Sequence, residues 1–478
     1  MFEMSREKSF VFSWIDNHSQ RIRKISDAIW RLAELGLMEY KSSRILSDAL
    51  EEAGFKIEYG IAGLPTAFTA SWGRGEPMIG VMGEYDALPG LSQDVVPFKK
   101  PLEGVENGHG CGHNIHGASG LAGVLAVKRL MENNGVEGTI KYFGCPAEES
   151  ASGKVWMVRE GVFNGVDAVL SHHPSTMNVA PLSGSLANNS VKFHFYGKSS
   201  HAAGSPEQGR SALDAVEIMD VGVNFLREHV IQDVRIHYII EHGGGQPNVV
   251  PDYARSWYLI RAPERMQVEE IYNRILAIAK GAELMTGTTH RVEFIKGVYN
   301  KIPNRTLSEC VTSNMRLIGV PRYTDEDISF AEKVAESIPK EAKVEELRKS
   351  KRPGWEEMVD WLMDKEVPDA WNEGEVSHGS TDVSDVSWQA PTMEFSTATY
   401  VLGTPGHSWQ VVAQSGSSLG HKSLLYASKI IAASIIDLLL HNDILEKAWK
   451  EHERRVAGRK YVSPVPDGLK PPLDLWEK

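Results

Sequence analysis

The sequence contains few cysteines and no excess of positive charge. Only 3 of its 478 residues are cysteine, too few for a disulfide framework, so we expect a reducing, cytoplasmic environment. Lys and Arg number 51 against 63 Asp and Glu, which gives a net charge of −12. A mildly acidic chain without a basic block is a poor candidate for binding nucleic acid or an anionic membrane.

Long apolar runs are also missing. No run approaches the roughly 20 residues that span a bilayer, and the N-terminal segment MFEMSREKSFVFSWIDNHSQ mixes charged and apolar residues without a signal-peptide core. Hydrophobic residues form 42% of the chain and charged residues 24%, as in ordinary globular proteins. Disordered, fibrous and membrane-spanning classes are therefore excluded, and the length predicts two or three domains.

Hydrophobic patterns near the N-terminus predict strands that alternate with helices. Apolar runs of strand length occur at 77–85, 138–144 and 166–171, and helical spacings occur at 9–56, 120–133 and 157–163. Similar patterns return late in the chain, with strands expected at 390–396 and 398–404, a final helix at 421–441 and a Pro-rich extended arm from Val462. This alternation predicts an α/β fold with a mostly parallel sheet flanked by helices.

The pattern changes near residue 185. From there to residue 298 the order is strand, helix, strand, strand, helix, strand, and 190–197 alternates apolar and polar residues like a half-exposed strand. That order is ferredoxin-like, antiparallel and open on one face. We therefore predict an α+β domain at 185–298, inserted between two parts, 1–184 and 299–478, of a larger α/β domain.

Four short segments carry side chains that bind metals, and three of them follow a predicted strand. They are GHGCGHNIHG (108–117), CPAEES (145–150), SHHP (171–174) and GTPGHSW (403–409), with His109, Cys111, His113, His116, Glu148, Glu149, His172, His173 and His407. Open α/β sheets form their sites at the carboxyl ends of strands. Thiol, imidazole and carboxylate ligands together suit Zn²⁺ or, with more oxygen donors, Mn²⁺.

The adjacent carboxylates Glu148 and Glu149 suggest a division of labour. One would bind a metal, and the other would stay free as a general base for a water activated by the cation, as in metal-dependent amide hydrolysis. Asp86, in the turn after 77–85, is a candidate to orient a ligating His. Taken singly, each feature also fits a solvated pair or a buried thiol, and Cys111 as a nucleophile is an alternative.

These motifs resemble the dinuclear metal-dependent aminoacylase/carboxypeptidase amidohydrolases. Besides the segments at 108–117 and 145–150, the similarity covers GEYDALPG (83–90), GKSSHAAGSPEQGRSALDA (197–215), GGGQPNVVPDYARSWYLIRAP (243–263) and HGSTDVSDVSW (378–388). ENGHGCGHN, GCPAEE and STDVSDVSW are most similar to the branch that hydrolyses p-aminobenzoyl-glutamate. The family's Asp is replaced by Asn114 and by Glu84 at two positions, neither of which is an expected ligand.

The resemblance implies roles for individual residues. Two divalent ions, Mn²⁺ or Zn²⁺, would be held by Cys111 as a bridge and by His113, Glu149, His173 and His407, with Glu148 as general base. The inserted domain would be a lid, from which His201 would reach the scissile carbonyl across a dimer interface and steady the oxyanion. Asn248 and Arg261 would hold the substrate's carbonyl or carboxylate.

The implied activity is metal-dependent hydrolysis of an N-acyl or N-aroyl amino acid. p-Aminobenzoyl-glutamate is the favoured substrate, which would place the chain in folate catabolism; recognition of glutamate needs a cation, for which Lys198, Arg210 and Arg261 are candidates. The alternatives are an aminoacylase or dipeptidase with another substrate and a non-catalytic partner subunit. We expect a homodimer formed through the lid, and a heteromeric partner is an option because the resembling branch belongs to a two-component hydrolase.

Overall fold

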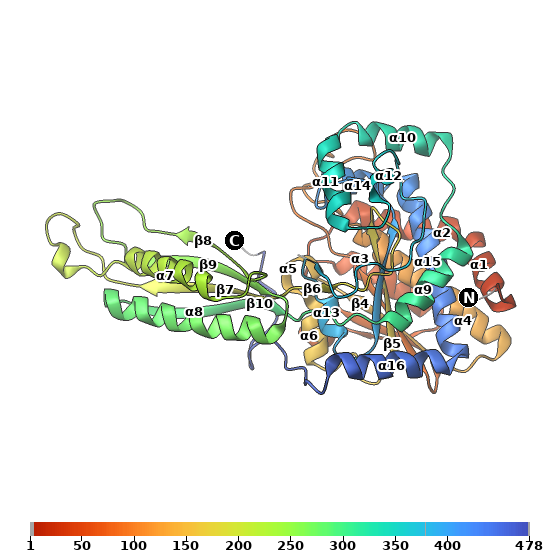
Figure 1. The fold of residues 1–478 in the computed structure, drawn as a ribbon, viewed down its shortest axis with the longest axis horizontal. Helices are drawn as coiled ribbons and strands as arrows, with labels where there is room; N and C mark the ends of the chain where they lie inside the picture. Colours follow the sequence, from red (N-terminus) through yellow and green to blue (C-terminus); the bar gives the residue numbers. More distant parts are fainter. Residues whose placement is uncertain (1–3, 378, 477–478) are drawn as a thin grey trace.

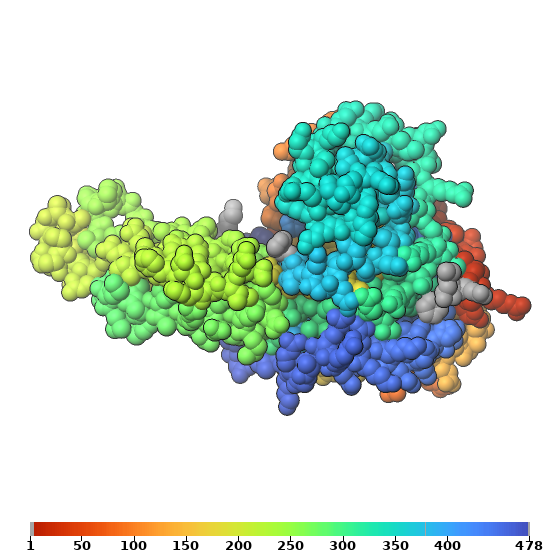
Figure 2. Space-filling model, viewed as in Figure 1, coloured from red at the N-terminus to blue at the C-terminus, as the bar shows by residue number. Residues whose placement is uncertain are grey.

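A large α/β body and an elongated lid make up the protein. The computed structural model describes residues 4–377 and 379–476, and the lid projects from one side of the body as a separate arm (Figures 1 and 2). His378, the first residue of one family-like motif, lies outside the described residues. We call the sheet and two helices between residues 187 and 298 the lid, and the remainder the catalytic domain.

Six strands form the central sheet of the catalytic domain. In spatial order they are β1 (Lys56–Tyr59), β2 (Phe68–Arg74), β4 (Gly138–Cys145), β3 (Met78–Glu84), β5 (Ala168–Ser175) and β12 (Thr392–Ala398). The last four are parallel, while β1 and β2 add an antiparallel edge. The predicted mostly parallel sheet is confirmed.

Helices cover both faces of this sheet. One face packs on α4 (His113–Asn134), α15 (Ser418–Leu440), α1 (Arg6–Asn17), α2 (Ser19–Leu32), α3 (Tyr40–Glu52), α9 (Arg305–Ile318) and α16 (Asn442–Val456). The other face packs on α6 (Gly153–Arg159) and α13 (Val383–Val386). The remaining helices are α5 (Glu148–Ala151), α10 (Asp325–Ala335), α11 (Lys340–Ser350), α12 (Trp355–Met358) and α14 (Trp409–Ser415).

Helix α15 explains how an apolar segment can pass unnoticed. Among the described residues it is the helix long and apolar enough to cross a bilayer, although Ser, Lys and Asp side chains interrupt its apolar runs. However, 83% of its most apolar window is buried inside the molecule. It therefore fits a core helix that packs lengthwise on α4.

The lid has the predicted ferredoxin-like arrangement. Its elements are β7 (Ala187–Tyr196), α7 (Ala212–Leu226), β8 (Arg235–His242), β9 (Tyr253–Ala262), α8 (Arg265–Thr286) and β10 (Thr289–Val298). The sheet order is β10-β7-β9-β8, antiparallel throughout. Both helices pack on one face, where side chains such as Phe193 and Tyr258 form a core of the lid's own. The exact limits 185 and 298 stay a prediction.

The length of β7 sets the reach of the lid. A short parallel pair, β6 (Gly184–Ser185) with β11 (Val376–Ser377), lies at the lid's base, and β7 then runs ten residues outward. At about 3.3 Å per residue this distance is about 30 Å. The loops after β7 and β8 therefore lie at the free end of the lid, away from the catalytic domain (Figure 1).

Two local predictions were wrong. Residues 398–404 do not form a second strand, because their main chain turns inward: Leu402 N donates to Leu362 O and Val401 N to the side chain of Gln414. The helix expected at 157–163 is α6 at Gly153–Arg159, since Gly161 adopts a positive φ of 72° and ends it.

The C-terminal arm (residues 462–476) is extended, as predicted, and lies along the catalytic domain near the lid's base. Val462 N donates to Tyr299 Oη at 3.0 Å. Further along, Arg159 Nη1 donates to Leu469 O at 2.9 Å. The arm is thus fixed at several points rather than by one contact.

Candidate metal centre and active site

The metal-binding side chains from the four segments meet at the carboxyl edge of the parallel strands. Three sets of ligand atoms each lie within 4.8 Å of one another. The sets are Cys111 with His113 and His173, Cys111 with Glu149 and His407, and His113 with Glu148 and Glu149. Two sets of three ligands therefore share one thiol, and a carboxylate outside both sets, Glu148, lies next to them.

A tight turn before α4 brings Cys111 and His113 together. Gly112 between them has a φ of +76°, and a Cβ on it would lie 2.1 Å from Tyr400 Oη, so only glycine fits. His113 then begins α4, while Cys111 Sγ lies 3.3 Å from His173 Nε2 at the end of β5.

Asp86 orients two of the predicted ligands at once. Its Oδ1 accepts a hydrogen bond from His113 Nδ1 at 2.7 Å, and its Oδ2 accepts one from Glu149 N at 3.0 Å. His113 therefore directs Nε2 into the cluster. His113 Nε2 and Glu149 Oε1 are buried and make no hydrogen bond of normal geometry to any described residue. Buried polar atoms left this way fit metal ligands.

The cluster favours the ionised thiol. Burial alone would raise the pKa of Cys111, but the charge of His173 and hydrogen bonds from His113, His173 and His407 outweigh it and lower the pKa to about 6. Hydrogen bonds to Cys111 and Glu149 in turn raise the pKa of His407 to about 10. A thiolate is the form of cysteine that binds metals, so the side chains present fit a pair of divalent ions.

Glu148 differs from its neighbour. Burial, together with the negative charges of Glu84, Asp382 and Glu149, raises the pKa of Glu148 well above its usual range. For Glu149, burial is outweighed by a hydrogen bond from His407 and the charge of His113, and the pKa is lowered. One carboxylate is thus set up to bind a cation and the other to hold a proton.

A buried ion-pair network next to the centre was missed at the sequence level. Lys154 Nζ lies 2.6 Å from Glu84 Oε1 and 2.6 Å from Asp382 Oδ1, and all three side chains are fully buried or nearly so. Glu84 Oε2 in turn lies 3.1 Å from His113 Nε2. The available signal was a lysine inside the apolar run GKVWMV, which forms α6.

The other histidines of the motifs are tied into the core. His109 Nε2 hydrogen bonds to Ile29 O, His116 Nδ1 accepts from Glu84 N, and His172 lies between the hydroxyls of Ser119 and Thr397. Burial lowers the pKa of each ring. Their surroundings explain why they are neutral hydrogen-bonding groups and not members of the three ligand sets.

The lid residues lie apart from the cluster within one chain. His201 and Asn248 belong to facing loops at the free end, where His201 pairs with Val249 and Ala202 N donates to Asn248 O. Lys198 and Arg210 pair in the same region. Arg261, at the end of β9, lies instead near the lid's base.

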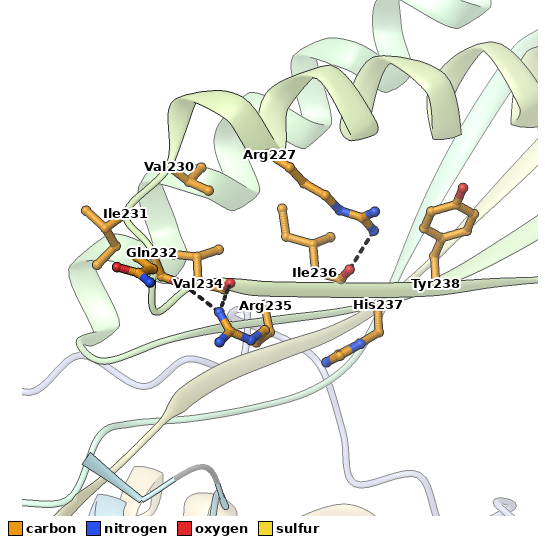
Figure 3. Close-up of a pocket in the computed structure, with 9 residues that line it drawn as sticks. All are labelled: Arg227, Val230, Ile231, Gln232, Val234, Arg235, Ile236, His237 and Tyr238. Carbon is orange, nitrogen blue, oxygen red and sulfur yellow. Dashed lines mark hydrogen bonds between the residues drawn. The ribbon is translucent and has the colours of Figure 1, made fainter. Parts of the chain in front are cut away.

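A cavity of about 510 Å³ at the base of the lid does not contain the cluster. It lies between the end of α7 and the start of β8 (Figure 3). Its two arginines donate to main-chain oxygens, Arg227 to Ile236 O and Arg235 to Val234 O. Of its lining residues only His237 is of a metal-binding type, so it offers no second metal centre.

Comparison with known proteins identifies the family. The description Peptidase family M20/M25/M40 matches residues 80–435. The chain belongs to this family. It is 39% identical over 471 residues to the B-type subunit of p-aminobenzoyl-glutamate hydrolase from Escherichia coli K12, covering 97% of this chain and 98% of that protein. It is also 29% identical to the Xaa-Arg dipeptidase of Mus musculus, covering 91% and 90%.

A solved structure shows the same fold. A putative aminohydrolase from methicillin-resistant Staphylococcus aureus superposes with a TM-score of 0.65 at 18% identity, covering 90% of this chain and all of that one. The predicted family resemblance is confirmed, and this M20 protein is an amide-bond hydrolase that depends on divalent metal.

Proposed function

We propose that this M20 hydrolase cleaves N-aroyl amino acids, with p-aminobenzoyl-glutamate as its preferred substrate, in the cytoplasm. The observation that carries the proposal is the pair of ligand sets that share Cys111, in a chain that aligns almost end to end with one of the p-aminobenzoyl-glutamate hydrolase subunits of Escherichia coli.

Two ions, Mn²⁺ or Zn²⁺, would be held by these sets. Cys111 would bridge them, with His113 and His173 on one side and Glu149 and His407 on the other. When bound, such ions polarise a carbonyl and lower the pKa of water. Asp86 keeps the His113 ring and the Glu149 main chain in place for this role.

Glu148 would act as general base. Its carboxylate lies beside both ligand sets, within reach of a water poised to attack the amide. It would take the proton of that water and return it to the leaving amino group. The buried negative charges around Glu148 favour its protonated form, which suits a group that must hold the proton between these two steps.

We propose that a second copy of the chain completes the site. β8 is an edge strand of the lid, and exposed apolar side chains lie on it and on α7, including Ile239 (57% exposed) and Phe225 (71%). Antiparallel pairing of β8 with its two-fold mate would bring the free end of one lid beside the base of the other. His201 and Asn248 would then reach the partner's site, where Arg261 would help to hold the substrate carboxylate.

The test is release of p-aminobenzoate from p-aminobenzoyl-glutamate by the purified chain. Reactions with added Mn²⁺ or Zn²⁺ are compared with chelator, and Glu148→Gln serves as the blank. Metal-dependent release absent from the variant is expected.

If metal-loaded protein releases nothing, the aroyl substrate is wrong for the chain acting alone. The assay is then repeated with the other p-aminobenzoyl-glutamate hydrolase subunit of Escherichia coli, which is itself 26% identical to this chain over 304 residues, as a heteromeric partner. Xaa-Arg dipeptides are the second candidate substrates, because the mouse dipeptidase aligns over most of the chain.

A further inference from the structure

A large, mostly apolar cavity lies next to the metal centre. Its volume is about 880 Å³, within the range of small-molecule sites. Its apolar lining comes from three parts of the chain, namely Leu35, the loop residues Pro89, Leu91, Pro101 and Val105, and the indole rings of Trp409 and Trp476.

Two walls of the cavity are continuous with the centre. Ser408 and Trp409 directly follow the predicted ligand His407, whose N donates to Gly110 O at 3.2 Å. Leu91 packs so closely on Gly110 that a Cβ there would lie 2.4 Å from Leu91 Cδ1. Gly110 precedes Cys111. The cavity wall and the turn that carries the thiol are therefore one packed unit.

The C-terminal arm supplies the third wall. Trp476 Nε1 donates to Gly36 O at 2.7 Å, a contact between residues 440 positions apart in the chain. Gly36 in turn lies against α5, because a Cβ on Gly36 would come within 2.2 Å of Ser150 Oγ, the residue after Glu149. Trp476 is thus held beside the catalytic carboxylates.

Trp476 is 38% exposed although it is among the largest apolar side chains in the protein. Its Nε1–H is satisfied by Gly36, which leaves part of the indole ring open to the cavity that it lines together with Trp409. Aromatic rings favour other flat rings at such positions, through offset or edge-to-face stacking.

We propose that this cavity binds the aromatic ring of the acyl group, and that Trp476 is a specificity-determining residue which favours aroyl over aliphatic acyl groups. This inference rests on the proposed hydrolysis of N-aroyl amino acids. The arm does not depend on Trp476 for its position, because Val462 and Leu469 anchor it upstream. The Trp476 side chain can therefore be changed without releasing the whole arm.

The experiment compares Trp476→Ala with the wild type on two substrates that share glutamate, p-aminobenzoyl-glutamate and N-acetylglutamate. We expect kcat/KM to fall about tenfold for the aroyl substrate, the scale of one lost aromatic contact, and less than twofold for the acetyl substrate. Trp476→Phe should keep most of the preference. Leu475→Ala, a neighbouring arm residue that does not line the cavity, is the matched control. Equal losses on both substrates, or none, would overturn the proposal.

Direct binding separates this inference from the proposed reaction. p-Aminobenzoate is titrated into the metal-loaded wild type and into Trp476→Ala by calorimetry, with acetate as the reference ligand. Binding that weakens about tenfold in the variant supports the subsite even if the wild type cleaves no aroyl substrate, in which case only the proposed reaction fails. Equal affinity in both proteins overturns the subsite and leaves the proposed reaction intact.

Discussion

The catalytic domain and the lid treat charge in opposite ways. In the catalytic domain, Lys154 is completely buried between Glu84 and Asp382. In the lid, Lys192 pairs with Glu241 on the open face of the sheet, where both side chains keep contact with solvent. The first sheet is covered by helices on both faces and the second on one face only.

The difference follows from sheet architecture. A parallel sheet covered on both sides offers solvent access mainly at its strand ends, so the polar groups needed for chemistry collect there and must satisfy one another. An antiparallel sheet with one open face keeps its polar groups hydrated and its edge available for pairing. One region is thus built to shift pKa values and the other to present a surface.

Replacing Glu148 should have the largest effect. Glu148→Gln keeps the shape of the side chain but cannot accept the proton, so we expect kcat to fall about 10²- to 10⁴-fold while metal content, measured by atomic absorption, stays unchanged. Glu241→Gln in the lid is the matched control and should retain activity. Near-wild-type turnover by Glu148→Gln would remove it as the base.

Replacing Lys154 should come next. Lys154→Met leaves two buried carboxylates without a cation, and we expect a loss of about 3–5 kcal/mol in unfolding free energy, measured by urea denaturation. The equivalent Lys192→Met should cost about 1 kcal/mol or less, since that pair is partly solvated. Similar losses at the two sites would contradict the contrast between the domains.

His201 tests whether the lid acts across the dimer. His201→Ala should lower kcat by about 10²-fold, the scale of one oxyanion donor, without changing metal content. Equimolar mixing and reassembly with Glu148→Gln should restore about a quarter of wild-type activity, because half of the dimers are mixed and each holds one complete site. If mixing restores nothing, His201 serves its own chain or has no catalytic role.

The smallest effect is expected at Asp385, where α13, the lid's exit and the C-terminal arm meet. Tyr299 N and Tyr461 Oη donate to its carboxyl group, and burial raises its pKa to about 7. The folded protein therefore holds a proton that the unfolded chain releases near about pH 4, so stability present at low pH is lost as the pH rises toward about 7.

Asp385→Asn mimics the protonated form and should weaken this pH dependence by about 1 kcal/mol or more between about pH 5 and about pH 7.5. Urea unfolding at the two pH values measures it, with Asp369→Asn, whose side chain is 88% exposed, as control. An unchanged pH dependence would show that Asp385 is ionised across this range.

Most of the fold could be read from local patterns. Parallel strands such as β3 are continuous apolar runs, and the lid strands alternate, so both kinds of sheet have a direct sequence signature. β1 was not predicted, because KIEY is short and its side chains are exposed or half-buried. The segment 398–404 has strand composition, but its polar main chain is satisfied by Ser175, Leu362 and Gln414 instead of a neighbouring strand.

The site was only partly accessible to the same reasoning. Cys111, His113, Glu149, His173 and His407 stand in motifs whose order along the chain suggests one edge of a sheet, and the structure brings them together. Local patterns carry no information on partners distant in sequence. Lys154 with Asp382, or Trp476 with Gly36, are visible only once the chain is folded.

The seat of Trp476 has a practical consequence for anyone who handles the protein. Any sequence appended after Lys478 begins two residues from a side chain that lines a cavity beside the catalytic carboxylates, whereas α1 lies on the side of the catalytic domain remote from the lid (Figure 1). An affinity tag at the carboxyl end would crowd this cavity, and one at the amino end would leave it open.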